Sequence, residues 1–407
     1  MSDTAYDVVI VGGGMVGASL AYALGHQPIK TALVEATPFR SHTQPSFDDR
    51  SVALSYGTQR IFESLDLWDK MQASATAIQH IHVSDRGHFG VTRMHAAAQG
   101  VDALGYVIEN RILGNVLATQ LNALPHTQIL CPAQLLDASI TQQHVALKIK
   151  QGTRTTDITT RLLIAADGGD STVRDKLGVR VTRHSYEQVA MVANLRFEHS
   201  HRQVAYERFT EDGPLAVLPL SDDRCSLVWT TTPEKAARLI AAPDAEFITG
   251  LRHYFGLRLG KVMQLGARKA YPLQLIRADT QVIPRVALIG NAAHTLHPVA
   301  GQGFNLGLRD VAVLAQIIID TVKDGRDPGG AGVLAAYAEW RASDHARVVS
   351  LTDGLIKMFS NSFMPLALAR NVAMITIDIL PPLKRALTRQ TMGLTGKLPR
   401  LARGLDL

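Results

Sequence analysis

A glycine-rich turn close to the start of the chain constrains its fold more than any other feature. The apolar residues 8–11 lead directly into Gly12-x-Gly14-x-x-Gly17, and this pattern predicts a strand followed by a helix that begins near Met15. Glycine at these spacings lets the backbone approach a pyrophosphate, and the N-terminus of the following helix faces the phosphate charge. The turn therefore predicts a βαβ unit that binds a dinucleotide.

A second apolar run, residues 31–34, ends at Glu35. An acidic residue roughly 20 positions after such a turn accepts hydrogen bonds from the adenosine ribose. Its charge would repel a 2′-phosphate, so the pattern favours an unphosphorylated adenosine. This unit alone does not distinguish NAD from FAD.

Two later fragments make a flavin the better interpretation. Asp167 follows a short, largely apolar strand expected at residues 161–166, at the carboxyl end of a parallel strand, where ligands of open α/β sheets bind. Residues 290–305 follow another apolar run and form a glycine-lined turn before a helix. Backbone N–H groups and the helix dipole there would stabilise negative charge on a reduced flavin ring. The three fragments together predict a bound FAD.

Length and composition indicate a globular protein with more than one core. The chain has 407 residues, of which 46% are hydrophobic and 19% charged, against a prior of roughly 150 residues per domain. Residues 183–275 contain strands rich in β-branched and aromatic residues, with one expected helix near residues 245–254. We predict an α/β fold with a Rossmann-like FAD-binding domain, an interleaved antiparallel-sheet substrate domain and a helical C-terminal region. The expected segments are FAD-binding at 1–75, 106–182 and 276–350, substrate-binding at 76–105 and 183–275, and a helical, basic, amphipathic region at 351–407.

Most of the net charge of +6 lies at the C-terminal end. Residues 365–407 contain seven basic and two acidic residues, interleaved with large aliphatic side chains. This pattern is typical either of an amphipathic segment that lies on a membrane surface or of a helical cap packed on the enzyme. Nucleic acid is not expected as a partner, because the basic residues lack an aromatic stacking platform.

No targeting or spanning segment is expected from the sequence. The first strand begins within a few residues of the N-terminus, and no run approaches the roughly 20 apolar residues of a membrane span. We therefore expect a cytoplasmic protein, either free or peripheral on the inner membrane.

The glycine turn, Asp167-Gly168 and residues 290–310 together resemble the single-component FAD-dependent aromatic monooxygenases. Residues 82–88, 206–210 and 213–216 are most similar to the ubiquinone-biosynthesis hydroxylases within that family, and the resemblance covers essentially the whole chain. It implies that NAD(P)H reduces the flavin, that molecular oxygen forms a flavin hydroperoxide, and that a polyprenyl phenol is hydroxylated on its ring. It leaves the choice between NADH and NADPH open.

The resemblance also implies roles for particular residues. Gly12, Gly14 and Gly17 would hold the pyrophosphate and Glu35 the ribose. The other residues that it places at the cofactor are Arg50, Arg111, Asp167, Asn291, Gly301, Gly303 and Asn305. Asn291 departs from the aspartate usual in the family, and losing this charge would weaken FAD binding by about 1 kcal/mol.

A base near the flavin would deprotonate the phenol, and His297, beside the flavin-adjacent Pro298, is the sequence candidate. His294 and His297 offer no third ligand or nearby carboxylate in the sequence, so no metal site is expected.

Three alternatives stay open at this stage. The chain could be a related ring hydroxylase of the same pathway, a hydroxylase of a soluble phenol, or a non-catalytic flavin-fold subunit of a hydroxylase assembly.

Overall fold

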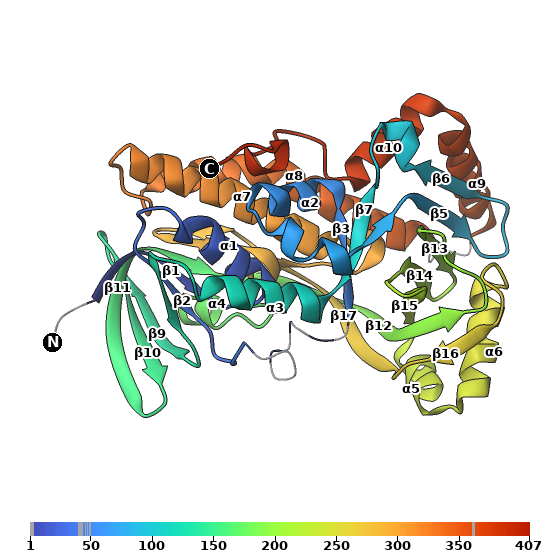
Figure 1. Ribbon diagram of the computed structural model, residues 1–407, viewed down its shortest axis with the longest axis horizontal. Helices are drawn as coiled ribbons and strands as arrows, with labels where there is room; N and C mark the ends of the chain where they lie inside the picture. Colours follow the sequence, from blue (N-terminus) through green and yellow to red (C-terminus); the bar gives the residue numbers. More distant parts are fainter. Residues whose placement is uncertain (1–3, 40–43, 45, 47, 49, 360–362) are drawn as a thin grey trace.

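The computed structural model describes residues 4–39, 44, 46, 48, 50–359 and 363–407. Figure 1 shows a nucleotide-type sheet at one end of the long axis and a second large sheet at the other, with the long helices α7 (Gln302–Lys323) and α8 (Ala331–Phe359) lying across the molecule. This arrangement confirms the predicted α/β fold with a second, mainly antiparallel sheet.

The first sheet has eight strands in the described part of the chain. A parallel core places β1 (Thr4–Val11) between β11 (Arg154–Ala165) and β2 (Thr31–Val34). The other strands are β8 (Thr127–Leu130) beside β2, β19 (Val286–Leu288) and β18 (Val282–Ile283) beyond β11, and β10 (Val145–Gln151) and β9 (Gln134–Ile140) on the antiparallel extension of β11.

Both faces of this sheet are buried. Val8 and Ile10 of β1 pack in one core cluster, whereas Val9 and Val11 pack in another. A strand that is buried on both faces needs apolar side chains at successive positions, and this explains the continuous apolar run in the sequence. Helices α1 (Met15–Gly25), α3 (Asn110–Leu121) and α7 cover one face, and α4 (Thr172–Lys176) follows β11.

The second large sheet has nine strands in the described chain. Its main path is β20 (His294–Thr295), β17 (Lys269–Ala278), β12 (Val181–Phe197), β15 (Arg224–Thr231), β14 (Gly213–Pro219), β13 (Val204–Thr210), β5 (His80–Asp85) and β6 (Val91–His95), with β16 (Val262–Leu265) beside β12. Strands β12 and β17 extend past the expected boundaries at 183 and 275. The division into segments stays a prediction.

Two helices, not the one predicted, pack with this sheet. Besides α6 (Asp244–Phe255), the structure contains α5 (Pro233–Ala241), which Thr232 caps and which begins with proline at its first position. A smaller sheet of β3 (Ser51–Ser55), β7 (Gly105–Glu109) and β4 (Thr76–Ile78) lies with α2 (Tyr56–Ser64) between the two large sheets.

The C-terminal region divides into two parts with different locations. Helices α9 (Met364–Ile379) and α10 (Pro381–Thr391) lie over the β5–β6 hairpin. Residues 392–407 then return to the nucleotide end, where Leu401 and Ala402 are buried and Arg60 of α2 donates to the Arg403 carbonyl. Of the two interpretations of the C-terminal pattern, the packed cap describes residues 392–407, because Leu401 and Ala402 belong to the core.

No single helix in the described ranges is long and apolar enough to cross a membrane. Helices α9 and α10 reach that length and composition only as a pair, and they are bent by 97° relative to each other.

Candidate active site

The glycine turn between β1 and α1 has the geometry of a phosphate cradle. Gly12 has a φ of +104°, and a Cβ atom on Gly17 would overlap with the Gly12 carbonyl oxygen. Gly14 precedes α1 without a side-chain cap, so the first N–H groups of the helix are free for a ligand. The predicted βαβ unit is confirmed, and its turn fits a pyrophosphate.

Glu35 lies at the end of β2 beside this turn. Its carboxylate accepts hydrogen bonds from the Gly13 N–H at 2.5 Å and the Thr37 N–H at 2.6 Å. These contacts fix the carboxylate where the sequence pattern predicts the ribose partner.

The three distant fragments meet at this turn. A Cβ atom on Gly12 would lie 2.6 Å from Asp167 Cα, and one on Gly290 would lie 3.1 Å from a Val16 methyl group. Asp167 Oδ2 accepts a hydrogen bond from the Val173 N–H at 3.0 Å, whereas the buried Oδ1 has no partner in the described chain. Burial raises the pKa of Asp167. An unpaired buried acceptor at this position fits a polar ligand such as the cofactor.

A cavity of about 650 Å³ adjoins the third fragment and continues between the second sheet and helices α8, α9 and α10. The lining is predominantly aliphatic. Six residues predicted from the sequence to lie at the cofactor or the reacting ring share this cavity: Arg50, Asn291, Pro298, Gly301, Gly303 and Asn305.

Asn305 holds the wall of the cavity together. Its Oδ1 accepts a hydrogen bond from the Ser55 N–H at 2.8 Å, and its Nδ2 donates to the carbonyl oxygens of Ala53 at 2.8 Å and Gly301 at 2.7 Å. The amide therefore joins β3 to the turn around Gly301, which has a φ of +59°.

The two predicted arginines lie in different environments. Arg50 lines the cavity, pairs with Asp48 at 2.6 Å and stacks over the Tyr271 ring at 4.5 Å. Arg111 lies in the first turn of helix α3, pairs with Glu109 at 2.9 Å and is not among the residues that line the cavity.

His297 does not face the cavity. Its ring is buried, its Nδ1 accepts a hydrogen bond from the Val299 N–H at 3.2 Å, and it packs edge-on against Tyr186. Burial lowers the pKa of His297 to about 4, so the imidazole is neutral near pH 7. This placement favours a structural role in the loop over the general base suggested by the sequence.

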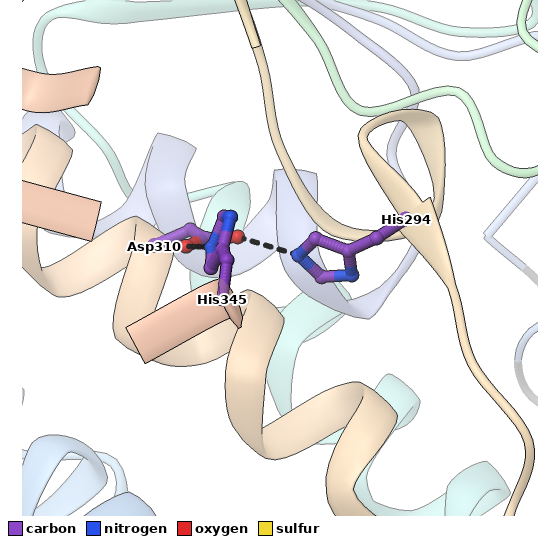
Figure 2. A group of neighbouring side chains, drawn as sticks. All are labelled: His294, Asp310 and His345. Carbon is purple, nitrogen blue, oxygen red and sulfur yellow. Dashed lines mark hydrogen bonds and ion pairs between the residues drawn. The ribbon is translucent and has the colours of Figure 1, made fainter. Parts of the chain in front are cut away.

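His294 belongs to a separate buried cluster, shown in Figure 2. Asp310 of α7 accepts from His294 Nε2 at 3.1 Å and, on its other oxygen, from His345 Nε2 of α8 at 2.6 Å. The premise that no carboxylate lies near His294 is therefore wrong, because helix packing brings α7 and α8 against β20.

Interactions with the Asp310 carboxylate hold this cluster together. Arg341 Nε donates to Asp310 at 2.6 Å. Burial alone would raise the pKa of Asp310, but the His345 and Arg341 interactions hold it well below its usual range. Because Arg341 already neutralises the carboxylate, the contacts describe a network that joins α7 and α8 to β20 of the second sheet.

Sequence reasoning missed the acidic residue among the described residues of the cavity wall, Glu207 on β13. Ala205, Glu207 and Phe209 alternate along the strand and all line the cavity. An acidic residue at an inward position of an alternating strand was the available signal. Burial raises the pKa of Glu207 to about 7, although a hydrogen bond from the Ala300 N–H opposes the shift.

A phosphate-binding turn, a buried ribose-type carboxylate and an adjoining apolar cavity define a flavin-dependent oxidoreductase of the aromatic hydroxylase type. The fold agrees: p-nitrophenol 4-monooxygenase PnpA from Pseudomonas putida DLL-E4 superposes with a TM-score of 0.80, covering 97% of this chain and 100% of that one at 20% identity. At that identity the likeness concerns the fold alone.

The sequence profile described as FAD binding domain matches residues 5–352. Ubiquinone hydroxylase UbiL of Rhodospirillum rubrum is 37% identical over the whole chain and 94% of its own length. The 3-demethoxyubiquinol 3-hydroxylase of Escherichia coli K12 is 32% identical over 97% of this chain and 100% of its own, and human COQ6, a mitochondrial ubiquinone biosynthesis monooxygenase, is 31% identical over 94% and 92%. The chain belongs to the FAD-dependent aromatic hydroxylases, in the family of these ubiquinone hydroxylases.

Proposed function

We propose that this enzyme hydroxylates the ring of a polyprenyl methoxyphenol in ubiquinone biosynthesis, as a 2-octaprenyl-6-methoxyphenol hydroxylase does. The cavity carries the proposal: it lies within the size range of small-molecule sites, roughly 300–1,000 Å³, and its wall is mostly aliphatic. The aliphatic lining suits an isoprenoid chain, and the end nearest Pro298 and Gly301 suits the phenol ring. The names of the relatives support this choice over a soluble phenol.

The cofactor assignments rest on the three fragments. Gly12, Gly14 and Gly17 would hold the pyrophosphate, Glu35 the ribose, and Asp167 and Asn291 polar groups of FAD. Gly301 and Gly303 would face the ring, while Asn305 fixes their turn and Arg50 closes the wall. Bound FAD supplies electron transfer from NAD(P)H to molecular oxygen and delivery of one oxygen atom to the ring.

Product analysis tests this function. We expect the purified yellow enzyme, given NADH or NADPH, oxygen and a prenylated methoxyphenol, to form a dihydroxylated ring product that carries one additional oxygen atom. A flavin-loaded enzyme that hydroxylates only unprenylated phenols would favour the soluble-substrate alternative. A colourless protein that fails to bind FAD would favour the non-catalytic subunit of a hydroxylase assembly.

Asn291 provides a direct test of the cofactor site. The Asn291→Asp substitution should tighten FAD binding about fivefold, since a carboxylate forms hydrogen bonds stronger by about 1 kcal/mol than those of a neutral amide. Titration of apoprotein with FAD measures this change. Asn115→Asp, on the exposed side of α3, adds the same charge away from the cavity and should leave affinity unchanged. Equal FAD affinities of the wild type and Asn291→Asp would show that Asn291 does not contact the cofactor.

We further propose that the α9–α10 surface binds an anionic membrane, peripherally. Seven large apolar side chains there are 45–76% exposed: Phe363, Met364, Leu368, Val372, Ile379, Leu380 and Leu383. Residues 364, 368 and 372 form one helical stripe, while Met374 and Ile377 of the same helix line the cavity. The exposed Arg385 and Arg389 of α10 suit anionic headgroups. One helix layer thus separates the cavity from this surface, which suits a substrate that resides in a bilayer.

Vesicle flotation tests this surface. The double substitution Leu368→Asp and Val372→Asp should reduce binding to phosphatidylglycerol-containing vesicles more than about tenfold, because each apolar side chain contributes roughly 1.5–3 kcal/mol on burial. Met263→Asp, which changes a 62% exposed methionine on β16, should have no effect. Wild-type protein that does not co-migrate, or that forms a dimer through this face, would contradict the proposal.

A further inference from the structure

Glu207 is an isolated carboxylate in an apolar wall. Its neighbours on the paired strands are Val83 of β5 and Ala216 of β14, and both also line the cavity. Among the described lining residues, Glu207 is the only acidic one, and no ion pair of Glu207 occurs within the described chain. A carboxylate in such surroundings costs more to bury than an apolar or amide side chain of similar size.

The carboxylate also touches the turn that adjoins the proposed flavin position. It accepts a hydrogen bond from the Ala300 N–H. Ala300 has a φ of +56° and immediately precedes Gly301. Glu207 therefore connects the substrate sheet with the cofactor loop, at the end of the cavity where the phenol ring is proposed to lie.

The surroundings of Glu207 bring its pKa close to neutral pH. The other charged or titratable side chains that line the cavity are Arg50, Arg370 and Tyr206. Arg50 and Arg370 are paired with Asp48 and Asp85 respectively. Desolvation is the main cause of the raised pKa of about 7. A base with this pKa is half ionised near pH 7 and is suited to accept a phenol proton.

We propose that Glu207 is the catalytic base that deprotonates the phenol before ring hydroxylation; this inference rests on the proposed function. The phenol O–H bond breaks, its electron pair stays on the phenolate oxygen, and the proton forms a new O–H bond on the Glu207 carboxylate. The phenolate donates electron density to the ring carbon that receives oxygen. Oxygen and the nicotinamide reductant are those of the proposed hydroxylation.

The decisive variant is Glu207→Gln, which keeps the shape and an oxygen acceptor for the Ala300 N–H but removes the base. With the FAD-loaded enzyme and a prenylated methoxyphenol, we expect product formation to fall about 100- to 1,000-fold while NAD(P)H oxidation continues. The rise of the wild-type rate through pH 7 should disappear. A ring-fluorinated substrate, whose phenol ionises more readily, should recover at least tenfold of the lost rate. Glu211→Gln, which alters an exposed glutamate just after β13, should behave like the wild type.

A second measurement, the pH dependence of stability, does not require catalysis. A folded-state pKa above the unfolded value makes ionised Glu207 destabilising, and this effect develops as the pH rises from about 4.5 to 7. The thermal unfolding midpoint of Glu207→Gln should therefore increase relative to the wild type between pH 5 and 8.

Three outcomes would contradict the assignment of Glu207 as the base or the proposed function. Product formation by Glu207→Gln within about threefold of wild type would overturn the base assignment. Weakened FAD binding that accounts for the whole loss of rate would reduce Glu207 to a positioning residue for the loop and would also overturn it. A flavin-loaded wild type that hydroxylates no phenol would overturn the proposed function itself.

Discussion

Gly17→Ala is expected to abolish FAD binding at micromolar cofactor. A Cβ atom at this position would overlap with the carbonyl oxygen of Gly12 and would lie 3.1 Å from the Ala166 side chain. Relief requires the turn to open, and backbone strain of roughly 3 kcal/mol corresponds to a loss of affinity of about a hundredfold. The flavin absorbance of the purified protein and FAD titration of the apoprotein measure this loss.

The matched control is Gly332→Ala, the same change within a helix where the added methyl group meets nothing within 4 Å. It should bind FAD normally and gain about 0.5–1 kcal/mol of stability, because alanine favours the helix. A Gly17→Ala protein that is yellow and binds FAD with wild-type affinity would show that this turn does not hold the cofactor.

Arg370→Met is expected to destabilise the protein by about 3–5 kcal/mol, because the substitution leaves Asp85 as a buried charge without its ion-pair partner. Arg370 Nε lies 2.8 Å from Asp85 Oδ2, and both side chains are almost fully buried. Asn371 also donates to Asp85 at 2.8 Å, so this cluster joins α9 to the β5–β6 hairpin. Since Arg370 also lines the cavity, its loss should loosen the wall of the site. Urea denaturation measures the free energy of unfolding.

Two comparisons make this result specific. The pair of Arg93 and Asp378, 3.7 Å apart, is a less buried counterpart, since the Arg93 side chain is 53% exposed, and Arg93→Met should cost less than about 1 kcal/mol. The double variant Arg370→Met and Asp85→Leu removes both charges and should recover a large part of the stability. Arg370→Met with wild-type stability would mean that the buried pair does not hold α9 in place.

Local sequence patterns predicted the nucleotide-binding half of the fold well. The strand, glycine turn, helix and acidic residue form one short segment, and their order and spacing leave little freedom to the backbone. Helix α5 was not predicted although Thr232 and Pro233 form a readable helix start, because the residues before it have the β-branched and aromatic composition of strands. The C-terminal charge pattern was ambiguous because the same amphipathic sequence suits a core-facing helix and a membrane-facing one.

The site depended more strongly on packing between distant elements. The proposed base shifted from His297 to Glu207, since only the fold shows that the histidine is buried in its own loop while the glutamate faces the cavity. The cluster of His294, Asp310 and His345 comes from one short strand and two helices, and no sequence spacing links them.

The nucleotide turn, the ribose-type carboxylate and the family resemblance could all be read from the amino-acid sequence, because steric and hydrogen-bonding requirements over a few adjacent residues specify these features. The tertiary structure alone decided which polar side chains share the apolar cavity, how α9 covers it, and that residues 392–407 return to the core. Those outcomes depend on long-range burial, since the solvation and pKa of a side chain are set by neighbours that lie far away along the chain.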